Sequence, residues 1–239
     1  DRLATIDTAN ADHATGDLQL TDSALGSVAD LVIRARELAV QAASDTLGPA
    51  QRKIIATQIE QIEENLFTLA NTRDSAGHAL FGGEATGNAY LRDVAGNAVY
   101  VGTAAAADVP LGDGQTIKRG LTGPEVLNFT GPGGPTDLLA TLRQLASDLK
   151  GSSPDPAASA SAALDALSSS LDSVTASQTV VGARMAWIDM MSERRTSLGE
   201  MRSQERGTIG DVDLGATIAR LQQTMTVLEA SQASFTKLA

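Results

Sequence analysis

Along both ends of the chain, apolar residues recur at alternating spacings of three and four positions. This period places one apolar stripe on a helix and turns it toward a partner helix. Within residues 1–80 the stripe contains Leu18, Leu25, Val28, Val32, Ile55, Ile59, Ile62, Leu66 and Leu69. The spacing predicts one helix over residues 1–44 and a second from Pro49 to about Ser75, joined by the turn Thr46–Pro49.

The C-terminal part shows the clearest heptad pattern. One heptad position holds Leu164, Leu171, Gln178 and Met185, and the other holds Leu167, Val174, Val181 and Ile188. We expect both rows to form the buried seam of a helix that reaches about Arg206. Residues 207–213 then interrupt the pattern, and a last amphipathic helix starts at Leu214, with Asp211 and Asp213 as an acidic cap.

Proline and glycine crowd the middle of the chain, where they disfavour helix. Residues 88–93 and 98–101 flank a turn, as do residues 108–111 and 115–118, so each pair predicts a hairpin. A short amphipathic helix follows over residues 137–150.

The fold class predicted from these patterns is mainly α, a long antiparallel helix bundle or coiled coil with a small β-rich insert domain. Residues 1–80 form the N-terminal half of the helical core, residues 81–135 the insert, and residues 136–239 the C-terminal half. The two halves are expected to pair along their apolar rows.

Composition narrows the class of partners. The net charge of -11 argues against a nucleic-acid surface and against docking on an anionic membrane, so we expect neither as a partner. No stretch approaches the roughly 20 apolar residues that span a bilayer. Because the chain starts at Asp1 rather than Met and ends inside an expected helix, we expect a core fragment that lacks both native termini.

The sequence offers little catalytic or metal-binding chemistry. There is no cysteine, and His13 and His78 are the two histidines, which makes a zinc site improbable. The glycine-rich segments 112–114 and 131–134 lack the lysine and the spacing of nucleotide-binding loops and are interpreted as turns. We therefore expect no cofactor and no enzyme activity.

Several segments together resemble the flagellin superfamily. The segment Leu31–Ala42 is similar to the signature helix of that superfamily. Further segments resemble it in the order in which they occur along the chain: Ser44–Leu47, Gln51–Arg52, Leu69–Thr72, Leu80–Gly83 and Ile209–Asp213. Further details resemble the superfamily's adaptors at the hook–filament junction, namely Asn71–Asp74, Tyr100–Gly102 and Gly123–Phe129.

The resemblance implies a structural adaptor of the bacterial flagellum at the hook–filament junction, acting by self-assembly and subunit packing. A filament-forming flagellin is the alternative. A secreted needle-tip or carbohydrate-binding module is less favoured, and its recognition aromatics would come from Tyr90, Tyr100 and Phe129.

The same resemblance implies partners and location. The partners would be a neighbouring hook-associated protein, flagellin and an export chaperone, with self-association through the terminal helices that we expect to be missing. The protein would be extracellular, in the flagellum, after export through the flagellar secretion channel. Candidate subunit-interface residues are Arg34, Arg36, Glu37, Gln41, Arg52 and Asn71.

Overall fold

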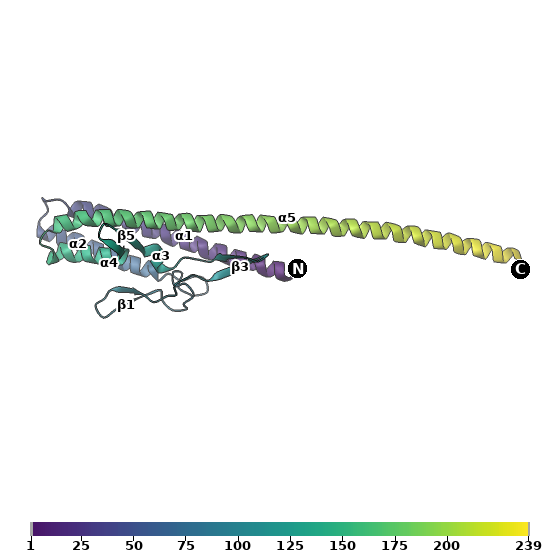
Figure 1. Cartoon of the computed structure of the whole chain (residues 1–239), viewed down its shortest axis with the longest axis horizontal. Helices are drawn as coiled ribbons and strands as arrows, with labels where there is room; N and C mark the ends of the chain where they lie inside the picture. Colours follow the sequence, from purple (N-terminus) through teal and green to yellow (C-terminus); the bar gives the residue numbers. More distant parts are fainter. Residues whose placement is uncertain (1, 239) are drawn as a thin grey trace. The chain divides into compact units, whose positions relative to one another are not determined.

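The chain starts with one long helix, α1 (Arg2–Ala42), which Figure 1 draws in purple. The computed structural model describes residues 2–238, and their side chains except those of residues 2–4, 210–214 and 238. It divides the chain into two units, residues 1–189 and residues 190–239, which are described separately.

A continuous buried stripe runs along α1. It contains the predicted residues Leu18, Leu25, Val28 and Val32, and it extends toward the N-terminus through Ala11 and Ala14. Thr21 interrupts the apolar row but is also buried, and its hydroxyl donates to the Asp17 carbonyl at 2.8 Å. The polar group is thereby satisfied inside the stripe.

The second helix, α2 (Pro49–Ala70), begins with proline in its first turn, where the missing N–H costs no hydrogen bond. It ends at Ala70, so the predicted end near Ser75 is wrong. The Asp74 side chain accepts hydrogen bonds from the backbone N–H groups of Ala76 and His78, at 2.9 and 2.8 Å. These local bonds compete with helix and turn the chain before Gly77 is reached.

The insert contains three two-stranded antiparallel hairpins in the described chain. Their strands are β1 (Tyr90–Arg92) with β2 (Ala98–Tyr100), β3 (Asp108–Gly112) with β4 (Gln115–Lys118), and β5 (Asn128–Gly131) with β6 (Gly134–Asp137). The first two hairpins were predicted from sequence. The third uses the glycine-rich segment 131–134 as its turn.

Short helices frame the last hairpin. The helix α3 (Gly123–Leu127) precedes it, with the Glu125 carboxylate accepting from the Thr122 backbone N–H at 2.6 Å. The helix α4 (Leu138–Ser147) follows it, capped by the Asp137 side chain, which accepts from the Ala140 backbone N–H at 2.8 Å. A π-helical turn, η1 (Asp148–Ser152), completes this segment.

The last helix, α5 (Pro156–Leu238), is assigned without a break. The interruption predicted at residues 207–213 is therefore wrong. Gly207 and Gly210 disfavour helix by only about 1 kcal/mol each, and no proline accompanies them. The cap predicted at Asp211 and Asp213 lies outside the residues whose side chains are described.

Within residues 1–189, the core lies where the helices face one another. The helix α2 packs against α1 and α4, and β3 packs against the early part of α1. Figure 1 shows α1 and the first part of α5 running in opposite directions. The predicted fold class, a mainly α antiparallel arrangement with a small β-rich insert, is confirmed.

Candidate assembly surfaces

The buried row of α5 differs from the predicted pair of rows. Leu167, Val174, Val181 and Ile188 are buried as one row. Their buried companions are the small residues Ala160, Ala163, Ser170 and Ser177. The predicted companions are only half-buried: Leu164, Leu171, Gln178 and Met185. Leu69 of α2 is likewise half-buried, whereas Ile55, Ile59, Ile62 and Leu66 are buried.

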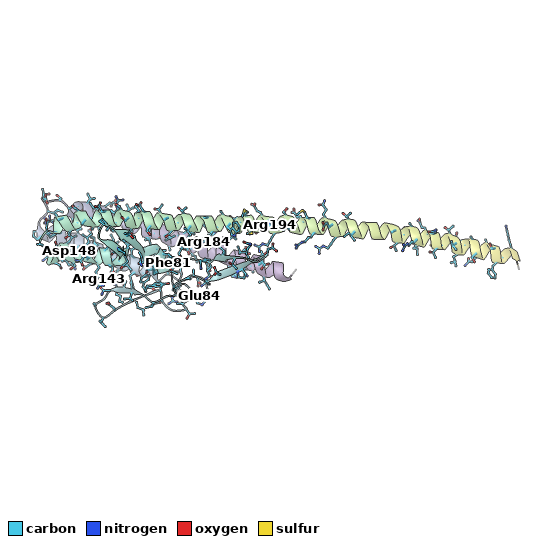
Figure 2. All side chains as sticks on the ribbon, viewed as in Figure 1. Phe81, Glu84, Arg143, Asp148, Arg184 and Arg194 are labelled. Atoms are coloured by element: carbon cyan, nitrogen blue, oxygen red, sulfur yellow. The ribbon has the colours of Figure 1, made fainter. Side chains whose placement is uncertain are left out.

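The small side chains beside the buried row of α5 allow the insert to approach the α5 backbone. The Ser177 hydroxyl donates to the Glu125 carbonyl at 3.3 Å, and the Ser173 hydroxyl donates to the Asn128 carbonyl at 3.4 Å. Further along, Arg184, which Figure 2 labels on α5, donates from Nη1 to the Gly120 carbonyl at 2.6 Å. Burial lowers the pKa of Arg184, and the charges of Glu125 and Asp108 oppose that shift. The seam of α5 thus includes the insert as well as helices.

The candidate interface residues of α1 lie on an exposed face near its C-terminus. Arg34 Nη1 contacts Glu37 Oε2 at 2.7 Å, and both side chains are 54% exposed. Gln41 is exposed. Arg36 is half-buried, and its Nε has no hydrogen-bond partner. Arg34, Glu37 and Gln41 are thus accessible on the surface of α1, whereas Arg36 Nε is closed to solvent.

Arg52 and Asn71 have partners inside the chain instead. Arg52 donates from Nε to the Ala42 carbonyl at 3.3 Å and from Nη2 to the Ser44 carbonyl at 2.9 Å, which caps the end of α1. Asn71 donates to the Phe67 carbonyl at 3.2 Å and accepts from the Tyr90 backbone N–H at 3.0 Å. Their contacts serve the turn between α1 and α2 and the start of β1.

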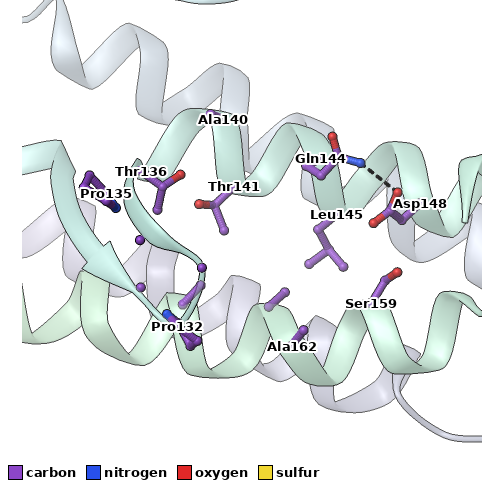
Figure 3. A pocket seen from close by; sticks show the side chains of 15 residues that line it. Pro132, Pro135, Thr136, Ala140, Thr141, Gln144, Leu145, Asp148, Ser159 and Ala162 are labelled. Atoms are coloured by element: carbon purple, nitrogen blue, oxygen red, sulfur yellow. Dashed lines mark hydrogen bonds between the residues drawn. The ribbon is translucent and has the colours of Figure 1, made fainter.

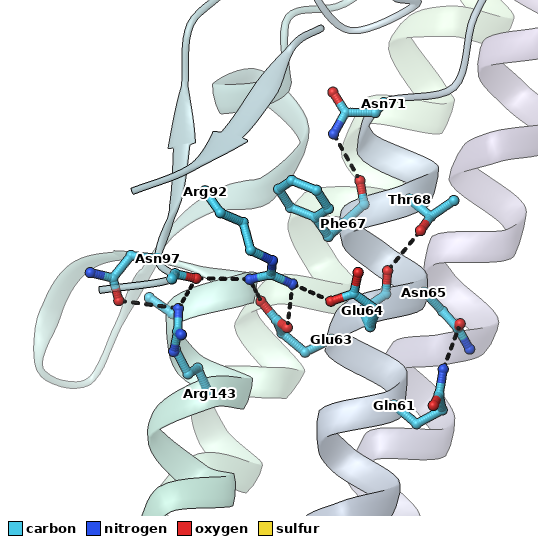
Figure 4. A network of polar contacts seen from close by, with 12 residues as sticks. Gln61, Glu63, Glu64, Asn65, Phe67, Thr68, Asn71, Arg92, Asn97 and Arg143 are labelled. Carbon is cyan, nitrogen blue, oxygen red and sulfur yellow. Dashed lines mark hydrogen bonds and ion pairs between the residues drawn. The ribbon is translucent and has the colours of Figure 1, made fainter. Parts of the chain in front are cut away.

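Two arginines fix the β1–β2 hairpin to the helices (Figure 4). Arg92 contacts the carboxylates of Glu63 and Glu64 at 2.9 and 2.5 Å, and its guanidinium lies 4.3 Å from the centre of the Phe67 ring. The hydrogen bond with Glu63 is the main reason that the pKa of Arg92 is raised. From α4, Arg143 donates to the carbonyls of Gly96 and Ala95.

The contacts of Arg92 and Arg143 were not predicted from the sequence. The pairs that they form join residues 28 to 48 positions apart, and a lone arginine in a predicted hairpin carries no sign of which helix it will meet. A basic residue in a strand opposite the acidic face of α2 was the available signal.

The described side chains of residues 190–239 leave a row of apolar residues in solvent. The row repeats at intervals of three, four or seven and comprises Ile218, Leu221, Met225, Leu228 and Phe235. Each is between 50% and 77% exposed. A row with this period on a helix is typical of a coiled-coil seam, so this segment presents a seam with no partner among the described residues.

A shallow apolar cavity of about 600 Å³ lies between the β5–β6 hairpin, α4 and the start of α5 (Figure 3). Its walls include Ala140, Leu145, Ala162 and Ala166, with Asp148 as the ionisable residue. The Asp148 carboxylate accepts from Gln144 Nε2 at 2.8 Å, and the Ser159 hydroxyl donates to Ser153 Oγ at 2.9 Å. Within the described residues, no group of three or more His, Cys, Asp or Glu side chains is placed to hold a metal ion.

The aromatic candidates for a carbohydrate surface do not form an exposed row. Tyr90 and Phe129 are buried, and Tyr100 donates its hydroxyl to the Thr103 carbonyl at 2.7 Å. The rings of Tyr90 and Tyr100 meet edge to face, with centres 5.3 Å apart. They form the core of the hairpin. Among residues 2–238, no helix has the length and apolar character needed to cross a membrane.

The helical N-terminal part matches a known family. Residues 3–86 match the bacterial flagellin N-terminal helical region. The chain carries a flagellin-type N-terminal region. The match covers α1, α2 and the turn after α2, where most of the segments that carried the resemblance in the sequence lie, and the recognition of the flagellin superfamily is confirmed.

Known relatives extend the similarity beyond this flagellin-type region. Flagellar hook-associated protein 3 of Escherichia coli (strain K12) is 28% identical over 241 residues, which cover 94% of this chain and 75% of that protein. Hook-associated protein-3 from Legionella pneumophila superimposes with a TM-score of 0.78 at 15% identity, covering 88% of this chain and 97% of the other.

A second Legionella pneumophila structure, the flagellar junction protein FlgL, has a TM-score of 0.67 at 16% identity and covers 77% of this chain and 94% of its own. At these identities the solved structures show a shared fold. The E. coli relative shows that the similarity in sequence runs through the insert and α5 as well as through the flagellin-type region.

Proposed function

We propose that this chain is a structural adaptor of the bacterial flagellum, at the junction between hook and filament, that works by packing against other axial subunits. The observation that carries the proposal is the uncovered apolar row Ile218–Phe235 on α5. Burying one such side chain contributes about 1.5–3 kcal/mol, so a partner helix that covers the row supplies a large part of the free energy of assembly.

The names of the relatives support an adaptor over a filament subunit. The E. coli and Legionella relatives carry the names of hook-associated or junction proteins. Partners of the chain would then be a neighbouring hook-associated protein on one side and flagellin on the other, and its location the flagellum outside the cell after export.

We assign separate roles to the parts of the chain. The helical residues 1–80 and 136–239 form the wall of the axial structure, and the insert, residues 81–135, faces outward. The exposed α1 face with Arg34, Glu37 and Gln41 supports a role as a contact between subunits, because these side chains have no partner outside α1 to which they are committed.

Labelling in the native bacterium tests the proposal. A short epitope in an exposed turn of the insert, after Gly133, allows gold-labelled antibody to mark the protein on isolated flagella. An adaptor gives a few gold particles confined to the hook tip. Label along the whole filament would identify a flagellin, and absence of label from flagella would reject both.

A further inference from the structure

The uncovered apolar row of α5 has one position that its apolar residues leave out. Between residues 218 and 228 the row advances by three, four and three residues, but the next interval, from Leu228 to Phe235, is seven. The position that divides this interval into four and three is occupied by Gln232. Its side chain is exposed, as are those of the row. Gln232 is thus the one polar position in a row that is otherwise apolar.

A glutamine in such a row cannot be covered in the same way as its apolar neighbours. Its side-chain amide has both donors and an acceptor, which need partners once water is removed. Thr21, the polar residue in the α1 stripe, meets this need inside its own helix by donating to the Asp17 carbonyl. The longer Gln232 side chain is exposed to solvent instead. A helix that covers the row must therefore supply a polar group opposite Gln232.

A second copy of the same helix supplies that group when it lies parallel and in register. Gln232 then faces its own counterpart, and each amide can donate to the carbonyl oxygen of the other. In an antiparallel pair of the same overlap, Gln232 would face Leu221, whose side chain offers no hydrogen bond. A single polar seam residue of this kind is known to fix register and helix number at some cost in stability.

The charges of this segment favour the same partner. Residues 190–239 contain six basic and six acidic side chains, so the net charge of -11 belongs to residues 1–189. The heptad positions that flank the row hold threonine, serine and glutamine, with Glu229 as the charged exception. In a parallel pair, Glu229 meets Thr224 of the other copy rather than a like charge. Two copies of this segment can therefore approach without like-charge repulsion along the row.

We propose that residues 218–235 pair with the same segment of a second copy of this chain, parallel and in register, and that Gln232 sets the register. The inference deepens the proposed function and rests on it, because subunits that surround one axis point the same way, as a parallel pair requires. The apolar residues supply the free energy of the contact. Gln232 makes every shifted or antiparallel alignment less stable, because there its amide would be buried without a partner.

Disulfide cross-linking measures the register, because the chain has no cysteine of its own. Leu228→Cys and Phe235→Cys each place one thiol in the row, and the two variants are mixed in a glutathione buffer in which disulfides exchange. We expect dimers of like variants to exceed mixed dimers by about tenfold, since a mixed dimer needs a shift that places one Gln232 amide opposite Met225. Adding Gln232→Leu to both variants is expected to remove most of this excess.

Sedimentation velocity of the cysteine-free chain measures the pairing itself. We expect a dimer that forms with rising concentration in the micromolar range and that Leu221→Asp abolishes. Gln232→Leu is expected to tighten the dimer about tenfold, because it replaces a buried amide by an apolar side chain. Gln223→Leu, on the opposite side of the helix, is the matched control and is expected to leave the dimer unchanged.

Three results would overturn the proposal. They are a chain that stays monomeric across the micromolar range, a dimer that Leu221→Asp leaves intact, and an excess of like dimers that Gln232→Leu does not reduce. These measurements use the isolated chain, so they are separate from the test of the proposed function in the bacterium. A monomeric chain whose Leu221→Asp variant fails to reach the hook tip would keep the adaptor role and assign the row to a different axial subunit.

Discussion

Arg92 Nη2 lies 2.9 Å from Glu63 Oε2, which joins the first strand of the insert to a buried position on α2. The same guanidinium lies over the Phe67 ring, so one side chain supplies a charge pair and a ring contact. The contact explains how a hairpin of three-residue strands keeps a fixed place, because an isolated two-stranded hairpin is marginal in water.

Replacing Arg92 by methionine leaves the Glu63 carboxylate buried without its partner. We expect Arg92→Met to lower the free energy of unfolding by about 1–3 kcal/mol, measured by urea titration. Arg34→Met is the matched control, since it removes an arginine from an exposed pair on α1. The control is expected to change stability by less than about 0.5 kcal/mol. Equal losses of stability in both variants would mean that the Arg92–Glu63 contact stabilises the fold no more than an exposed ion pair does.

Gly123 approaches the Tyr90 ring too closely for any larger residue. A Cβ at this position would lie 2.4 Å from Tyr90 Cε2. We expect Gly123→Ala to cost about 1–3 kcal/mol in thermal or urea unfolding, because the buried Tyr90 ring would have to shift to make room for the added Cβ. At Gly133 a Cβ meets nothing within 4 Å, so Gly133→Ala is expected to be close to neutral. A neutral Gly123→Ala would show that the ring moves aside.

Replacing a leucine is expected to cost more stability in the buried row of α5 than in the half-buried row beside it. Leu167 is fully buried, and we expect Leu167→Ala to lose about 2–5 kcal/mol of stability. Leu164 is half-buried, and Leu164→Ala is expected to lose about 1 kcal/mol. Urea unfolding of the two variants compares them under the same conditions. A larger loss of stability for Leu164→Ala than for Leu167→Ala would instead support the buried row that was predicted from the sequence.

Asp93 is held ionised by the turn of the β1–β2 hairpin. Its pKa is lowered, first by the Asn97 side chain, whose Nδ2 donates to Asp93 Oδ2 at 2.9 Å, and then by the Asn97 backbone N–H. Asn97→Ala is expected to raise the pKa of Asp93 toward its ordinary value, as followed by an NMR titration of the carboxyl carbon. Asn88→Ala serves as the control, because Asn88 accepts from Arg73 and not from Asp93.

The sign of the pH effect at Asp93 follows from the lowered pKa. The carboxylate stabilises the turn at and above its ordinary pKa, and this contribution is lost as the pH falls through the lowered value. An unchanged titration of Asp93 in Asn97→Ala would show that the turn keeps the carboxylate ionised by other means.

Periodicity predicted the helices and the α1 stripe because side chains three and four apart share one face. It misplaced the companion row on α5 because the sequence favoured Leu164 and Leu171 for their size. The structure uses Ala163, Ser170 and Ser177 at the adjacent positions, where small side chains let the insert approach. Which elements crowd a helix is a tertiary property that hydrophobicity along one segment does not contain.

Element ends were less predictable for a similar reason. The end of α2 depends on Asp74 capturing two backbone N–H groups, which requires the following turn to be formed. Arg119 contacts Asp17 and Asp74, which lie far from it in the sequence, so no local pattern indicates these contacts. The turn residues of the hairpins, by contrast, act locally and were found.

The central claim is that the uncovered row on α5 drives incorporation into the flagellum. Counting epitope-labelled subunits per hook tip in the native bacterium tests it most directly, with Leu221→Asp in the row and Gln223→Asp on the opposite side of the same helix. Both side chains are exposed, so neither change disturbs a packed core among the described residues. The account predicts that Leu221→Asp removes the label from hook tips while Gln223→Asp keeps it at the wild-type level. Normal incorporation of Leu221→Asp would contradict the account.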